Sequence, residues 1–305
     1  MRLGALRGPS AGICVIVAAS LAAATPAQAG QARSAGSAAR KVGPLLLAWG
    51  DNFYGQLGDG TVMDRHAPVA VNPPAGLKAT SARVGSFAAA VTPSGQLMAW
   101  GLGTSGQLGN GERKSSNLPV RVDLPRGVQV KAVSAGANSA IALTSTGRVL
   151  AWGDNHEGQL GNGRTRNSGR PVWVKIPRAT RIIAVGAGVG QMFAVTGSGG
   201  LLAWGDNEGG QLGDGTMENH KLPAFVHIPR SVRIATLAAG RYFSLALTST
   251  GKVWAWGDDS SGELGDGLNM ARATPFQVSL PGTVLAIGSG CEGSSSMAVV
   301  TNVKD

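Results

Sequence analysis

One short string of residues returns five times along this chain at an almost constant interval. Ala-Trp-Gly begins at residues 48, 99, 151, 203 and 255, so successive copies are 51, 52, 52 and 52 residues apart. Each copy is followed at a fixed distance by Gly-Gln-Leu-Gly-Asp-Gly or a close variant, and then by a proline at 68, 119, 171, 223 or 275. Five copies of one unit therefore tile residues 45–305, and the sequence predicts a repeat architecture.

Within each unit the apolar residues recur with a period of two, which is typical of strands. In the third copy, segments 170–176, 181–188, 191–197 and 200–205 are short, apolar or alternating, and Gly, Pro, Asn or Asp separates them. Glycine fits this pattern, since its 47 copies in 305 residues are about twice the usual ~7% and favour tight turns. Four strands per unit predict an all-β fold, a β-propeller of four-stranded blades.

Two sets of apolar residues occupy equivalent positions in all five copies. We expect the tryptophans to fill equivalent sites between neighbouring blades, and the valines to do the same on another strand. The tryptophans are Trp49, Trp100, Trp152, Trp204 and Trp256, and the valines are Val71, Val122, Val174, Val226 and Val278.

The stretch AWGDNHEGQLGNG at 151–163 gathers Asp, Asn, His and Glu among glycines, a composition that also suits a phosphate or metal loop. In every copy an Asp or Asn lies between two glycines, where the backbone needs unusual angles. His156 belongs to one copy only, and the stretch lacks the residue spacing of a P-loop or a calcium loop. We interpret the stretch as a turn.

The N-terminus has the organisation of an export signal. Arg2 and Arg7 precede an apolar run at 13–24, and a small-residue cleavage sequence ends at Ala29. We expect a signal peptide at 1–29, a flexible linker at 30–43 and the repeat domain at 44–305, with the mature protein secreted and starting near Gly30. Cleavage removes Cys14 and leaves Cys291, so no disulfide within the chain is expected.

The sequence carries no recognisable catalytic constellation. The histidines at 66, 156, 220 and 227 form no metal-ligand motif, and no nucleophile elbow is present. We expect no catalytic or metal-binding residues and no cofactor, and therefore a protein that is not an enzyme. An exported enzyme or lectin-like protein acting on cell-wall polymer is the alternative.

Basic residues recur at one position of three consecutive repeats. Arg126, Arg178 and Arg230 follow the same Leu-Pro or Ile-Pro pair, and Arg181 and Arg233 lie three residues after the last two. Equivalent positions lie on one face of a propeller, so we expect a one-sided basic arc. It is either a solvated rim or a docking surface for an acidic partner. Loop residues that differ between copies, such as Phe53 and Tyr54, are further candidates for partner binding.

The motif running from Ala-Trp-Gly through Gly-Gln-Leu-Gly-Asp-Gly, Pro-Val and Ser-Ala-Gly resembles the RCC1 (regulator of chromosome condensation) repeat family over residues 45–305. This resemblance implies a propeller, commonly of seven blades, whereas this chain has five copies. It also lacks the usual His after Ala-Gly, having Ser139, Gln191 and Phe243 at those positions.

Two functional styles of that family bear on this chain. One is nucleotide exchange on the GTPase Ran at chromatin, which the export signal argues against. The other is a secreted β-lactamase inhibitory propeller. We therefore expect a secreted, monomeric binding module for a protein or an anionic extracellular polymer. A pI near 10.3 also suits nucleic acid, but the basic residues are dispersed.

The two ends of the repeat region look complementary. The sequence 296–301 matches the second strand of a unit, and residues 45–49 supply the strand that would follow it. We expect five blades closed by an antiparallel pair between these segments, because closure removes open sheet edges.

Overall fold

A computed structural model of the chain describes residues 15–16, 46–72, 82–84, 86–92, 94–289 and 295–301, with only the backbone described at 15–16 and 82–84. Within these residues the fold contains strands and turns and no helix, which confirms the all-β prediction. The predicted signal peptide, apart from Val15–Ile16, and the predicted linker lie outside the described residues, as do both cysteines.

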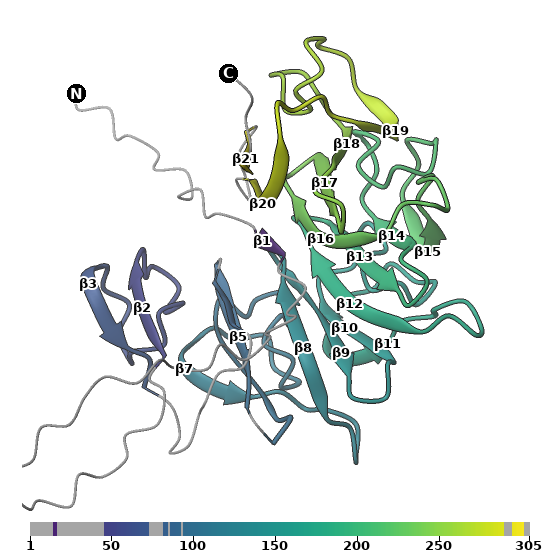
Figure 1. Cartoon of the computed structure of the whole chain (residues 1–305). Coiled ribbons are helices and arrows are strands. Elements are labelled where there is room, and N and C mark those ends of the chain that lie inside the picture. Colours follow the sequence, from purple (N-terminus) through teal and green to yellow (C-terminus); the bar gives the residue numbers. More distant parts are fainter. Residues whose placement is uncertain are drawn as a thin grey trace, which may run out of the picture.

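Four antiparallel sheets each contain four consecutive strands of one blade and follow one another along the chain (Figure 1). The first blade comprises β4 (Ala82–Val84), β5 (Phe87–Val91), β6 (Leu97–Gly101) and β7 (Ser116–Arg121). The second comprises β8 (Val130–Ala135), β9 (Ser139–Thr144), β10 (Val149–Gly153) and β11 (Ser168–Trp173). The third comprises β12 (Ile182–Ala187), β13 (Gln191–Thr196), β14 (Leu201–Gly205) and β15 (His220–Phe225). The fourth comprises β16 (Ile234–Ala239), β17 (Phe243–Thr248), β18 (Val253–Gly257) and β19 (Arg272–Gln277).

The remaining strands lie at the two ends of the repeat region. β2 (Leu47–Gly50) pairs with β3 (Arg65–Ala70), and β20 (Thr283–Ser289) pairs with β21 (Ser296–Thr301), each pair forming a two-stranded sheet. β1 (Val15–Ile16) adds to the β16 sheet, with Val15 opposite Ala238 and Ile16 opposite Leu237. The first blade thus contains the second Ala-Trp-Gly copy, in β6, and the fourth blade contains the fifth copy, in β18.

The burial of each strand explains its pattern of apolar and polar residues. The second strand of each complete blade is buried at every residue, because neighbouring blades cover both of its faces. These strands therefore read as continuous runs of small and apolar residues. The fourth strands are only partly buried, and a register shift separates their two halves.

The tryptophans fix how neighbouring blades pack. Trp152 is completely buried, and its Nε1 donates a hydrogen bond of 2.9 Å to the carbonyl oxygen of Gln107 in the turn of the preceding repeat. Trp100, Trp204 and Trp256 donate equivalent bonds of 2.8–2.9 Å. The turn passes so close that a Cβ on Gly161 would lie 2.7 Å from Trp204 Nε1, and φ of Gly161 is +59°. The turn interpretation of 151–163 is confirmed. All five valines are buried as predicted, but each lies directly after the end of a strand and not on the strand itself.

The predicted strand pair between residues 45–49 and 296–301 is wrong for this structure. β2 and β21 lie in separate two-stranded sheets, and Trp49 is 62% exposed where its four equivalents are buried. In a closed ring Trp49 would approach the carbonyl oxygen of Glu263, which accepts a 2.7 Å bond from Ser296 Oγ. The β2–β3 sheet and the β20–β21 sheet lie apart at the two ends of the row of blades (Figure 1).

Because successive strands of a blade run in opposite directions, the connections between strands lie alternately at one end of the blade and at the other. The long connections 51–64, 102–115, 154–167, 206–219 and 258–271 and the short ones 136–138, 188–190 and 240–242 leave from one end, here called the turn end. The opposite end, here called the hairpin end, holds hairpins 92–96, 145–148, 197–200 and 249–252 and the blade-to-blade loops 122–129, 174–181, 226–233 and 278–282.

Candidate functional site

The hairpin end carries a concentration of exposed positive charge. Its exposed basic residues are Arg126, Arg148, Arg178, Arg181, Arg230, Arg233 and Lys252. Lys175 begins the same kind of loop, but its Nζ lies beside Gly163 of the preceding turn. Among the described residues, Asp123 is the sole acid in the same connections. All five arginines of the predicted arc lie here, so they share one face as expected.

Local turn chemistry presents the arc arginines to solvent. In the loop 122–129, Val128 N donates to the carbonyl oxygen of Pro125, so Arg126 occupies the second position of a four-residue turn. The same bond joins Thr180 to Pro177 and Val232 to Pro229. An apolar residue anchors each turn from below, since Leu124, Ile176 and Ile228 are partly buried against the core. A rigid loop tip therefore holds each arginine outward.

The remaining arc arginines lie where each loop meets the first strand of the next blade. The carbonyl oxygens of Arg181 and Arg233 accept hydrogen bonds of 2.8 and 2.9 Å from the neighbouring hairpin. Arg233 Nη1 also donates to the carbonyl oxygen of Arg230 at 2.7 Å. These bonds tie the loops 174–181 and 226–233 to the rigid sheets.

The turn end has the opposite charge. Nearly all of the described acids lie in its long connections: Asp51, Asp59, Asp64, Glu112, Asp154, Glu157, Asp206, Glu208, Asp214, Glu218, Asp258, Asp259, Glu263 and Asp266. Phe53, 73% exposed, and Tyr54 are also here, with ring centroids 4.9 Å apart. The predicted partner-binding residues therefore do not form one site, because the two aromatics and the arginine arc lie at opposite ends.

Several turn-end acids are neutralised internally. Burial alone would raise the pKa of Asp59, but hydrogen bonds from Thr61 and Arg65 outweigh burial and lower it. Burial alone would also raise the pKa of Asp214. Hydrogen bonds from Thr216 and the charge of His220 outweigh burial and hold this pKa below its usual value. In the described part of the chain, no group of three His, Cys, Asp or Glu side chains could hold a metal ion. The described residues include no helix long and apolar enough to span a membrane.

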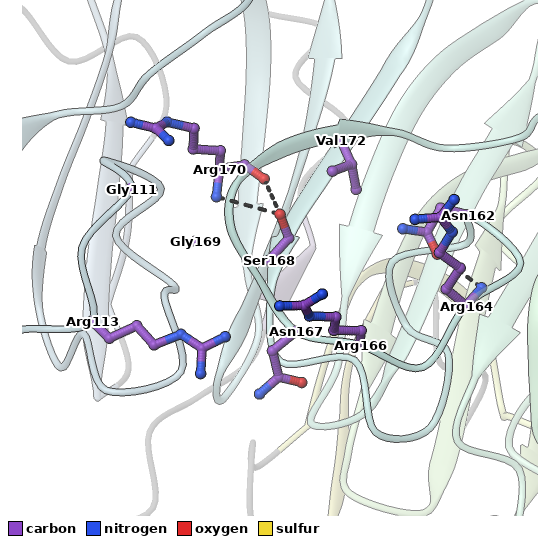
Figure 2. A pocket seen from close by; sticks show the side chains of 10 residues that line it. All are labelled: Gly111, Arg113, Asn162, Arg164, Arg166, Asn167, Ser168, Gly169, Arg170 and Val172. Carbon is purple, nitrogen blue, oxygen red and sulfur yellow. Dashed lines mark hydrogen bonds between the residues drawn. The ribbon is translucent and has the colours of Figure 1, made fainter.

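A pocket of about 400 Å³ interrupts the acidic surface between the second and third repeats (Figure 2). Its lining residues are Gly111, Arg113, Asn162, Arg164, Arg166, Asn167, Ser168, Gly169, Arg170 and Val172. Sequence reasoning missed this pocket, because its four arginines do not recur from copy to copy. The signal that could have found it is the dense Arg-Thr-Arg sequence at 164–166 beside a Gly-Asn-Gly turn.

Among curated proteins, the chain is similar to the ultraviolet-B receptor UVR8 of Arabidopsis thaliana, with 30% identity over 258 residues. That match covers 84% of this chain and 59% of UVR8. The human E3 ubiquitin-protein ligase HERC2 is 32% identical over 193 residues, which cover 63% of this chain and 4% of HERC2. The chain thus spans less than two thirds of either relative.

Solved structures show the same fold. Human WBSCR16 superposes with a TM-score of 0.70 at 21% identity, over 79% of this chain and 64% of that one. Prp20p from Saccharomyces cerevisiae gives 0.69 at 22% identity, over 83% and 65%. The family model described as RCC1-like domain matches residues 46–304. The chain therefore belongs to the RCC1-like domain family, and its four-stranded blades are those of a β-propeller.

Proposed function

We propose that this protein is an exported, non-enzymatic binding module that docks an acidic protein partner through its hairpin end. The observation that carries the proposal is the segregation of charge. The hairpin end holds seven exposed Lys and Arg side chains with Asp123 as the sole acid in its described connections, and the acids gather at the turn end. A surface of one sign steers an oppositely charged partner and orients it during encounter.

The architecture and the relatives support a binding role. The arc arginines stand on turns anchored to buried strands, so little loop ordering opposes association. Prp20p, whose solved structure has this fold, binds Gsp1p and histones, so a protein with this fold binds other proteins. If residues 1–29 act as the predicted export signal, the partner lies outside the cell.

The test compares capture by the wild type with capture by Arg126→Glu/Arg178→Glu/Arg230→Glu. Both proteins, starting at Gly30, are immobilised and exposed to culture supernatant and solubilised cell envelope. The matched control is Arg113→Glu/Arg164→Glu/Arg166→Glu, which makes the same charge change at the turn end. We expect acidic proteins to be retained by the wild type and the control and lost by the arc variant. Equal retention by the arc variant, with an unchanged melting temperature, would refute the docking surface.

Export is tested separately, by measuring where the secreted chain begins. Intact mass or N-terminal sequencing of secreted material should give a chain that starts near Gly30. A full-length product confined to the cytoplasm would refute export. In that case duplex DNA and poly-glutamate become the competing probes, and a steep loss of DNA binding with salt would favour the nucleic-acid alternative.

A further inference from the structure

We infer that the pocket between the second and third repeats is a binding site for a ligand that carries at least two phosphate or sulfate groups. It is formed by Gly111 and Arg113 of one turn and by residues 162–172 of the next repeat. Figure 2 shows Arg113 reaching from its own loop toward the loop that holds Arg166 and Asn167. Arg164 and Arg170 also line the pocket, and no acid is among its lining residues.

The pocket differs from the equivalent places in other repeats in the charge of two turn residues. In the first, fourth and fifth repeats an Asp of the turn binds a basic residue at the start of the following strand. These pairs are Asp59 with Arg65 at 2.6 Å, Asp214 with His220 at 2.8 Å and Asp266 with Arg272 at 2.7 Å. The second and third repeats have neutral residues at both positions, Asn110 with Ser116 and Asn162 with Ser168. The acid that would neutralise nearby arginines is therefore absent from the pocket.

Two arginines of the third repeat, Arg164 and Arg170, have no basic counterpart in any other repeat, whereas Arg166 has one in Lys114 of the second repeat. The position of Arg164 is Thr216 or Leu268 in the two following repeats, and that of Arg166 is Glu218 or Met270. The position of Arg170 is likewise uncharged in those repeats. A purely structural role would act equally in every copy, and Arg164 and Arg170 do not recur. This difference favours a role in recognition, which loops on a rigid scaffold commonly perform.

Most of the pocket's positive charge is uncompensated. Arg170 pairs with Asp123, its Nε lying 3.1 Å from Oδ2, and both side chains remain well exposed. Within the described residues, Arg113, Arg164 and Arg166 have no acidic side chain within 4.0 Å. Glu112 is adjacent to Arg113 in the chain but does not line the pocket. Guanidinium groups stay charged at all physiological pH values, so the site is permanently cationic.

The walls of the pocket are held in place before any ligand arrives. Asn155 Nδ2 donates to the carbonyl oxygens of Arg164 and Arg166 at 2.9 and 3.1 Å, and Asn167 Oδ1 accepts a 2.8 Å bond from Asn155 N. Gly111 N donates to the carbonyl oxygen of Gly169 at 2.8 Å, which joins the two walls. Preorganised donors lose little entropy on binding.

The ligand class follows from chemistry and size. Guanidinium groups bind phosphate and sulfate oxygens through paired, parallel hydrogen bonds. A volume of about 400 Å³ lies in the range of about 300–1,000 Å³ for small-molecule sites. The three guanidinium groups without an acidic partner carry more positive charge than one phosphate or sulfate dianion neutralises. The site therefore fits a diphosphate, a multiply phosphorylated compound or a sulfated sugar.

The test is calorimetric titration of the folded protein with sulfate, inorganic phosphate, pyrophosphate and a multiply sulfated disaccharide at fixed ionic strength. We expect at least one of the two multiply charged probes to bind at one site per chain, at least ten-fold more tightly than inorganic phosphate or sulfate. Preference between pyrophosphate and the sulfated sugar identifies the source of the anionic group. Absence of saturable binding by both would overturn the inference.

Two variants test whether the measured binding occurs at the pocket. Arg164→Gln/Arg166→Gln should weaken binding at least ten-fold, and Asn162→Asp should weaken it because it restores the acid found in other repeats. The matched control, Arg178→Gln/Arg230→Gln, makes the same charge change at the hairpin end and should alter affinity less than two-fold. Equal losses in both double variants would mean diffuse attraction to a basic protein and would refute a defined site. Loss of partner capture by the arc variant is independent of these measurements.

Discussion

The turns of the third and fifth repeats have the same fold but opposite chemistry at one buried position. In the third repeat Asn155 is fully buried, and its Nδ2 donates to two loop carbonyls while its Oδ1 accepts a 2.8 Å bond from Leu160 N. In the fifth repeat Asp259 takes this place. Its Oδ1 accepts the equivalent 2.7 Å bond from Leu264 N, but its Oδ2 is buried with no hydrogen-bond partner among the described residues.

At this position the first and fourth repeats also have Asn, and the second has Gly103, so among the five turns the fifth alone places a carboxyl group here. In the first and fourth repeats the Asn side chain also donates to the turn Asp, as Asn207 Nδ2 does to Asp214 Oδ1 at 3.3 Å. In the fifth repeat two carboxyl groups meet instead. Burial first, and the neighbouring Asp266 carboxylate in addition, raise the pKa of Asp259. A proton on Asp259 supplies the missing donor.

The largest expected loss of stability follows removal of the Asn155 side chain, whose amide makes three hydrogen bonds. Asn155→Ala removes three hydrogen bonds and leaves a buried N–H of Leu160 unpaired, which should cost about 3 kcal/mol of unfolding free energy. Chemical denaturation followed by tryptophan fluorescence measures the loss. Asp259→Ala is the matched control and should cost clearly less, because it removes one bond and a partly unsatisfied carboxyl. Equal losses would remove the distinction between the two turns.

Exchanging the two residues should move stability in opposite directions. Asp259→Asn supplies the absent donor at nearly constant shape and should stabilise the protein at pH 7 by about 1–2 kcal/mol, the cost of a buried unsatisfied polar group. Asn155→Asp should destabilise by a similar amount. Melting curves of both variants against the wild type provide the measurement, and a lower melting temperature for Asp259→Asn would contradict the interpretation of Asp259.

The gain from Asp259→Asn should depend on pH, with a sign fixed by the pKa shift. Because the pKa of Asp259 is higher in the folded than in the unfolded state, the folded state binds the proton more tightly. The stabilisation this gives the wild type is complete below the unfolded value of 3.8 and is lost as pH rises through the folded pKa. The advantage of the variant should therefore be largest at neutral pH and shrink toward pH 4. A constant difference would exclude titration of Asp259.

Most of the fold could be predicted from the sequence because it is repeated. A period of 52 residues and a twofold apolar pattern suffice to place four strands per unit. Trp100, Trp152, Trp204 and Trp256 fill equivalent inter-blade sites as predicted, and Trp49 does not. The two failures go together, because Trp49 lies in β2, the strand that does not pair with β21. A closed ring also requires a particular angle between blades, and no sequence period specifies that angle.

Of the two candidate sites, one could be predicted from the sequence and the other could not. The arginine arc could be predicted because equivalent positions in successive repeats must share a face. The pocket could not, since Arg113 and Arg170 occupy different positions of neighbouring repeats, and only folding places the loop of one against the strand of the next. Asp259 shows a third case: its substitution for Asn is visible in the sequence, but its lack of a donor is visible only in three dimensions.

The smallest expected effect concerns the ion pairs that separate charged turns from neutral ones. Asp59 accepts hydrogen bonds from Arg65 and from the Thr61 side chain and backbone, and Arg65 is about one third exposed. Partly exposed pairs contribute about 0–1 kcal/mol, so Arg65→Ala should lower the unfolding free energy by less than about 1 kcal/mol. The matched control in a neutral turn is Ser168→Ala, which removes only a local contact between Ser168 Oγ and the backbone of Arg170. Denaturation in low and high salt measures both, and only the Arg65→Ala difference should shrink as salt screens the pair. A loss above about 2 kcal/mol that does not respond to salt would instead assign Arg65 a packing role.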